Sequence, residues 1–191
     1  MPTKISKELK EAILHMPERE KDKLLIRLIN KDQTLISKLQ YELLEGEGEM
    51  ERRRQEIADS MEEVFSRDNF PFWHDTPGLL MMVMRDFSGD INRHIKITKD
   101  KYGEVELFLK LINLAFSKQF SILKGNEYRA EKFADYTCRK AQLILSRLEK
   151  MDSDYYLDFE KPVNEMLGHL HGYFPTQYRM KNYGLPQEWT Y

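Results

Sequence analysis

The stretch NEYRAEKFADYTCRKAQLILSRLEK, residues 126–150, decides the fold class, because its side chains repeat with the period of an α-helix. At about 100° per residue, its apolar positions fall on one stripe: Ala130, Phe133, Thr137, Ala141, Ile144 and Leu148. Acidic residues gather along one flank of this stripe and basic residues along the other. The pattern predicts a helix that packs one face into a core and presents a ridge of positive charge.

Helical spacing of apolar residues recurs on both sides of this stretch. Short helices are expected at 6–15, from Pro17 onward and after Asp32, and longer ones at 50–66, 76–98, 101–124 and 153–172. Pro162 lies inside the last of these ranges, where we expect a kink or two short helices. The range 101–124 is apolar on most sides, so we expect it at the centre of a bundle. In the second short helix, one apolar face is expected to be buried: Leu24, Leu25, Leu28 and Ile29.

These elements predict an all-α protein in which three or four short N-terminal helices are joined to a four-helix bundle. Breaks in the periodicity divide the chain into a helical unit at 1–66, an aromatic linker at 67–78, the bundle at 79–172 and an aromatic C-terminal tail at 173–191.

Composition supports this fold class. With 41% hydrophobic and 12% aromatic residues, 191 residues are enough to bury a core. Only 9 Gly and 7 Pro are present, which disfavours a β-sandwich, because that fold needs many turns. The charged fraction of 32% suits long helices with one solvated face.

The single cysteine, Cys138, leaves no disulfide and no cysteine-based zinc site within one chain, which favours a reducing compartment. The N-terminus lacks the apolar core of a signal peptide, and no apolar run is long enough to cross a bilayer. We therefore expect a cytoplasmic protein with no membrane partner. The net charge of −2 makes nucleic acid an unlikely partner for the chain as a whole.

The basic ridge of residues 126–150 is the first candidate site. Six cations within one arc could meet phosphate groups or an acidic protein surface: Arg129, Lys132, Arg139, Lys140, Arg147 and Lys150. The alternative is a solvated face that neighbouring acids neutralise, with Asp135 and Arg139 four residues apart as one such pair.

A second candidate is a divalent metal site. Carboxylates and imidazoles recur four residues apart on two expected helices, a spacing that can bind a metal ion: Asp86, Asp90, His94, Glu165 and His169. All-α nucleotide pyrophosphohydrolases use metal sites of this general type, and the resemblance is one of architecture only. The alternative is a set of surface carboxylates, with Asp86 or Asp90 pairing with Arg93.

Aromatic residues form a third candidate. They gather in the linker and in the tail, where they could form a protein interface or close the ends of the bundle: Phe70, Phe72, Trp73, Tyr178, Tyr183, Trp189 and Tyr191.

No sequence motif indicates an enzyme with a nucleophile. The chain lacks a Gly-rich phosphate loop, a Gly-x-Ser-x-Gly elbow, a His-Glu-x-x-His pair and an EF-hand loop. The leading hypothesis is a non-enzymatic interaction or scaffold protein that binds another protein and needs no cofactor. The alternatives are a metal-dependent hydrolase of phosphorylated small molecules and a weak nucleic-acid binder that uses the basic ridge.

Overall fold

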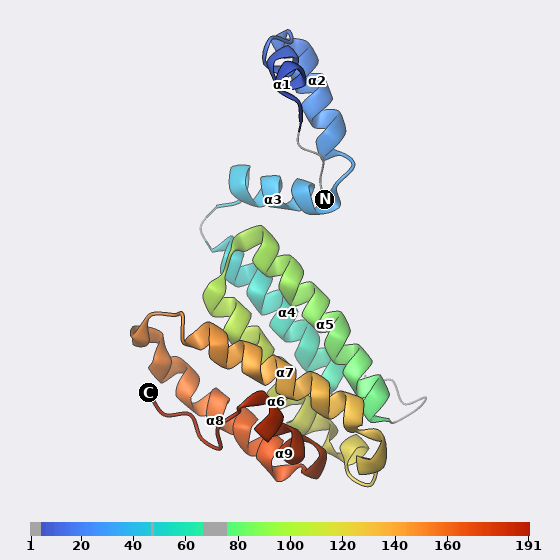
Figure 1. Ribbon diagram of the computed structural model, residues 1–191, viewed down its shortest axis with the longest axis vertical. Helices are drawn as coiled ribbons and strands as arrows, with labels where there is room; N and C mark the ends of the chain where they lie inside the picture. The colour runs from blue at the N-terminus through green and yellow to red at the C-terminus, as the bar shows by residue number, and fades with distance from the viewer. Residues whose placement is uncertain (1–4, 47, 67–75) are drawn as a thin grey trace. The chain divides into compact units, whose positions relative to one another are not determined.

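The computed structural model describes residues 5–46, 48–66 and 76–191 (Figure 1). These residues form nine α-helices and no β-strand, which confirms the all-α prediction. They divide into two compact units, residues 1–46 and 47–191. In the described residues, no helix is both long enough and apolar enough to cross a membrane.

Unit 1 contains three short helices, α1 (Lys7–Leu14), α2 (Glu18–Ile29) and α3 (Gln33–Leu43). The Ser6 hydroxyl accepts a hydrogen bond from the Leu9 N–H at 3.2 Å and so begins α1. The Asp32 carboxylate accepts from the Thr34 and Leu35 N–H groups and begins α3 in the same way. None of the three helices buries a residue, so the buried face expected for α2 is wrong.

Unit 2 is built around α6 (Lys101–Leu123), as the sequence predicts. This helix packs against α4 (Glu49–Phe65), α5 (Pro77–Thr98), α7 (Glu131–Leu148) and α8 (Tyr156–Gly172) (Figure 1). Because α6 has neighbours on several sides, most of its residues are buried.

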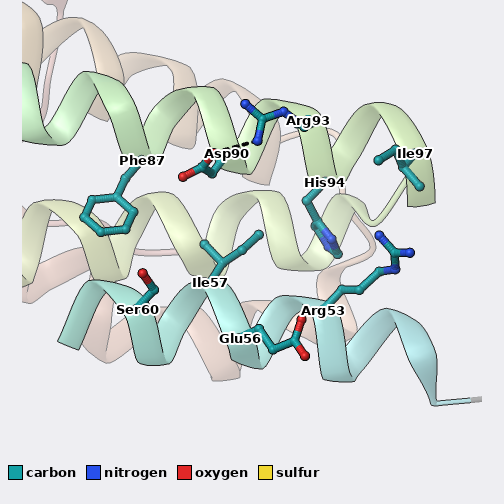
Figure 2. Close-up of a pocket in the computed structure, with 9 residues that line it drawn as sticks. All are labelled: Arg53, Glu56, Ile57, Ser60, Phe87, Asp90, Arg93, His94 and Ile97. Carbon is teal, nitrogen blue, oxygen red and sulfur yellow. Dashed lines mark hydrogen bonds and ion pairs between the residues drawn. The ribbon is translucent and has the colours of Figure 1, made fainter. Parts of the chain in front are cut away.

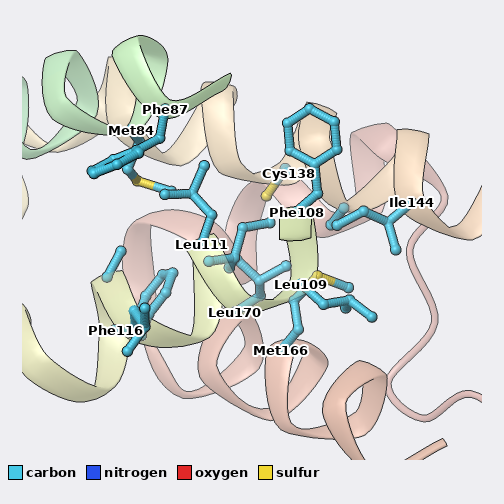
Figure 3. Close-up of a cluster of buried hydrophobic side chains, with 14 of the residues drawn as sticks. Met84, Phe87, Phe108, Leu109, Leu111, Phe116, Cys138, Ile144, Met166 and Leu170 are labelled. Carbon is cyan, nitrogen blue, oxygen red and sulfur yellow. The ribbon is translucent and has the colours of Figure 1, made fainter. Parts of the chain in front are cut away.

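The core of unit 2 lies where α5, α6, α7 and α8 meet. Figure 3 shows Met84 of α5, Leu111 of α6 and Leu170 of α8 gathered around this point. Cys138 of α7 belongs to the same cluster and is fully buried. Burial raises the pKa of its thiol to about 12, so Cys138 acts as a small apolar residue of the core.

The division between the units falls at Gly46, whereas the sequence analysis grouped residues 49–66 with the N-terminal helices. Helix α4 packs against α5 and α6 and buries Ala58, Met61 and Phe65 there. The Phe65 ring lies 6.0 Å from the Phe87 ring of α5. An apolar stripe shows that a helix buries one side, but it does not identify the helix that covers it.

The tail folds onto unit 2 and begins with a helix that periodicity did not reveal, α9 (Phe174–Met180). The Tyr183 hydroxyl donates to Asp135 of α7 at 2.6 Å. The backbone of Trp189 exchanges two hydrogen bonds with the Asn164 side chain of α8, at 2.8 and 3.1 Å. Residues 173–191 are therefore part of the bundle's surface.

Candidate functional site

The structure separates the six residues of the basic ridge into different surroundings. The Arg129 guanidinium lies 5.2 Å from the Tyr128 ring, before α7 begins. Arg147 donates to Glu104 of α6 at 3.2 Å, and Lys150 is exposed after the helix ends. Three members of the ridge line one hollow: Lys132, Arg139 and Lys140.

This hollow, which we call the cationic pocket, has a volume of about 790 Å³ and lies between α5, α7 and α9. Its lining combines five cations, two carboxylates and two apolar side chains: Arg85, Lys132, Arg139, Lys140, Arg179, Glu131, Asp135, Met81 and Tyr136. Five positive charges against two negative ones leave an excess of three positive charges. The whole chain, by contrast, has a net charge of −2.

Asp135 neutralises one side of the cationic pocket. Its carboxylate accepts from Arg139 at 2.8 Å and from Arg179 at 3.2 Å, and Arg179 also pairs with Glu131. The hydrogen bond from the Tyr183 hydroxyl, together with the two guanidinium groups, holds the pKa of Asp135 below its ordinary value. Asp135 therefore stays ionised and joins α7 to α9 and to the tail.

The other three cations of the pocket, Arg85, Lys132 and Lys140, have no carboxylate within 4.0 Å among the residues that the structure describes. Lys140 is half-buried, with its ammonium 4.2 Å from the centre of the Phe108 ring of α6 and 5.9 Å from that of Tyr136. Burial lowers the pKa of Lys140, which shows that its charge is partly removed from water. The faces of two rings attract this charge but do not neutralise it.

Tyr136 forms the apolar wall between Lys132 and Lys140. Its hydroxyl lies 2.5 Å from the Ser88 hydroxyl and donates to the Met84 carbonyl at 3.2 Å. Burial raises the pKa of Tyr136, so the phenol stays neutral. The pocket thus combines unneutralised cations with a fixed aromatic surface.

The predicted metal ligands do not meet in the structure. Among the described residues, no three His, Cys, Asp or Glu side chains are grouped so that they could hold a metal ion. Asp86 is exposed on α5, and Asp90 pairs with Arg93 at 2.8 Å (Figure 2). Glu165 and His169 lie near each other on α8, with 3.7 Å between their nearest side-chain atoms. This geometry lends no support to the hydrolase alternative.

His94 belongs to a second pocket, of about 270 Å³, between α4 and α5 (Figure 2). Its Nε2 lies 3.2 Å from Asp100 Oδ2, and both side chains are almost fully buried. Asp100 also accepts from the Gly103 N–H at 2.8 Å and so begins α6. Burial on its own would raise the pKa of Asp100, but hydrogen bonds from His94 and Gly103, and the nearby Arg54, lower it overall. This imidazole stabilises the start of a helix.

The aromatic candidates have different surroundings. Tyr183 and Trp189 are half-buried on the bundle, and Trp189 lies 5.3 Å from the ring of Tyr156. Tyr178 and Tyr191 are exposed. The remaining three lie outside the described residues: Phe70, Phe72 and Trp73. An interface at the exposed tyrosines stays a prediction.

Unit 1 carries many exposed apolar side chains, and two of them, Leu25 and Leu28, belong to the face that the sequence analysis expected to be buried. Nine of its large apolar side chains are between 36% and 82% exposed: Ile5, Leu9, Leu14, Leu25, Ile26, Leu28, Leu35, Leu43 and Leu44. We call these nine residues the uncovered apolar set. Helical periodicity revealed most of them, but it could not show that unit 1 leaves them uncovered.

Two members of the cationic pocket also escaped sequence analysis. Arg85 and Arg179 come from α5 and α9, far in the sequence from the ridge on α7. Only the packing of these helices brings them together.

Comparisons with protein-family models, curated proteins and solved structures gave no match to this chain.

Proposed function

We propose that this protein is a non-enzymatic α-helical scaffold whose unit 1 pairs with unit 1 of a second copy. The observation that carries the proposal is the uncovered apolar set, because none of the three helices that hold it buries a residue. Pairing would bring two copies of unit 2 together and present both of their surfaces at once.

The short helices of unit 1 need another surface to pack against. They have 8, 12 and 11 residues, and isolated helices shorter than about 12–15 residues are marginal in water. Helices of this length gain most of their stability by packing an apolar face against another surface. A surface that covers the uncovered apolar set would supply that packing.

The amount of apolar surface suits a dimer. A stable interface removes about 800 Å² of each partner from water. The uncovered apolar set gives each copy nine large side chains that a second copy could remove from water. Apolar area drives such association, because its removal from water is favourable.

The charges of unit 1 favour a second copy over a strongly charged partner. Residues 1–46 carry nine Lys and Arg and eight Asp and Glu, so two copies do not repel each other. In the first turn of α2, Glu18 and Glu20 alternate with Arg19 and Lys21, so this turn carries no net charge that would repel a second copy.

Light scattering of the full chain tests this proposal. The wild type should have the mass of a dimer at about 200 µM, and the double variant Leu25→Glu with Leu28→Glu should have the mass of a monomer. Both leucines are exposed, so the charges do not disturb a core. The control is Leu157→Glu on α8, where a leucine that is 73% exposed lies in unit 2.

The control should remain a dimer. A wild type that is monomeric at every concentration would overturn the proposal. So would a double variant that still dimerises, because the interface would then lie elsewhere.

A further inference from the structure

The cationic pocket concentrates positive charge, with five cations and two carboxylates in its lining. Arg139 and Arg179 both pair with Asp135, and Arg179 also pairs with Glu131, whereas Arg85, Lys132 and Lys140 have no carboxylate within 4.0 Å among the described residues. A half-buried charge without a counter-ion costs free energy, and a bound anion would remove that cost. Lys140 is half-buried between two aromatic rings, and the electrostatic attraction of Glu104 offsets the effect of burial only in part.

The spacing of the three free cations indicates the size of the anion. Lys132 and Lys140 lie eight residues apart on α7, which is about 12 Å along a helix. Arg85 reaches the same pocket from α5. Because the three cations come from separate positions on two helices, a ligand with two or more linked phosphate groups can contact more of them at once than a single phosphate group can.

The surroundings of these cations favour a compact ligand over a long nucleic-acid strand. Beyond the pocket, Arg147 is paired with Glu104 of α6, so the positive surface does not continue unpaired along α7. The pocket volume of about 790 Å³ is in the range of small-molecule sites. Tyr136 and Met81 add an apolar surface against which a base or another ring could pack.

We propose that the cationic pocket binds a small molecule with two or more linked phosphate groups, and that Arg85, Lys132 and Lys140 contact those groups. Arg85 would donate two parallel hydrogen bonds to phosphate oxygens, and the two lysines would act as point charges. This site lies within unit 2 and goes beyond the proposed function, because it needs neither a second copy nor unit 1.

Isothermal titration calorimetry of the full chain at low salt tests the proposal, with inorganic tripolyphosphate, ATP and orthophosphate as probes. Tripolyphosphate and ATP should bind once per chain, and orthophosphate should bind at least tenfold more weakly. A higher affinity for ATP than for tripolyphosphate would show that the adenine ring of ATP also contacts the pocket. Affinity should fall steeply as salt is added.

Single substitutions locate the site. Lys132→Gln, Lys140→Gln and Arg85→Gln should each weaken tripolyphosphate binding about tenfold. Lys132 is exposed, so its variant cannot fail by disturbing the core. Lys150→Gln is the matched control, because it removes the same charge from the exposed end of the ridge and should leave the affinity unchanged.

Three results would overturn the proposal. One is that neither tripolyphosphate nor ATP binds at millimolar concentration. Another is that Lys150→Gln weakens binding as much as Lys140→Gln does, which would show diffuse attraction without a site. The third is that a single-stranded oligonucleotide binds more tightly than ATP and several chains share it, which would make the partner a nucleic acid.

Discussion

Gly103 lies in the first turn of α6, directly against the carboxylate of Asp100 that begins this helix. A Cβ atom at Gly103 would collide with Asp100 Oδ2 and would lie 2.8 Å from Arg54 Cδ. Gly103→Ala should therefore lower the free energy of unfolding by about 2 kcal/mol, because neither neighbour can move without losing its contacts. Urea unfolding measures this change.

Gly89→Ala on α5 is the matched control for Gly103→Ala. A Cβ atom at Gly89 would meet nothing within 4 Å. Since alanine favours a helix more than glycine does, the control should raise the free energy of unfolding by about 0.5 kcal/mol. Equal effects at the two glycines would contradict the packing described around Asp100.

Asp100 also makes stability depend on pH. Its pKa in the folded protein is below the ordinary value, so folding favours the carboxylate. The resulting stabilisation is present above the ordinary pKa and is lost as the pH falls through the folded pKa. Asp100→Asn should therefore be less stable than the wild type by about 1–3 kcal/mol at neutral pH, and this difference should shrink below about pH 4.

Urea unfolding of both proteins at about pH 7, 5 and 3 measures this difference. The same substitution at Asp22, an exposed residue of α2, controls for the change in net charge. A difference that stays constant from pH 7 to pH 3 would contradict an ionised Asp100 paired with His94.

At the scale of elements, Tyr183 makes two of the hydrogen bonds that join the tail to α7. Its hydroxyl donates to Asp135 at 2.6 Å, and its carbonyl accepts from Gln142 of α7 at 3.1 Å. Tyr183→Phe removes only the first of these bonds and should lower the free energy of unfolding by about 1 kcal/mol. Urea unfolding measures this, with the exposed Tyr178→Phe as the control, for which no change is expected. Equal stabilities of wild type and Tyr183→Phe would show that the tail is held by other contacts.

Periodicity predicted the long helices well because their apolar positions recur over many turns. It indicated the central place of α6, since few helices are apolar on so many sides. It missed α9, which has only 7 residues and too few turns to show a period. It also expected two short helices or a kink at Pro162, where α8 runs through the proline as one helix.

In the cationic pocket, contacts within one helix could be predicted from the sequence, whereas contacts between helices could not. Lys132, Arg139 and Lys140 were identified as neighbours because they lie on one face of one helix. Nothing in the sequence indicates that Lys140 lies over Phe108, because α6 and α7 meet only through packing. The pairing of Arg139 with Asp135 could be predicted, because the two residues lie four positions apart on one helix. The second partner of Asp135, Arg179 of α9, could not be predicted, because only the packing of α9 against α7 brings it there.

At the scale of the whole molecule, the two units differ in what they bury. Unit 2 has a continuous core of apolar residues, whereas the helices of unit 1 bury none. Exposed apolar side chains beside a unit with a folded core are typical of a protein that associates with another protein. The pairing of two copies through unit 1 is the central claim that follows.

Amide hydrogen exchange of the full chain, at about 1 µM and about 200 µM, tests this claim most directly, because it follows the helices of unit 1 themselves. Pairing predicts that the amides of α1, α2 and α3 are weakly protected at the low concentration and strongly protected at the high one, while those of α6 do not change. Protection of α1–α3 that is the same at both concentrations would contradict the account.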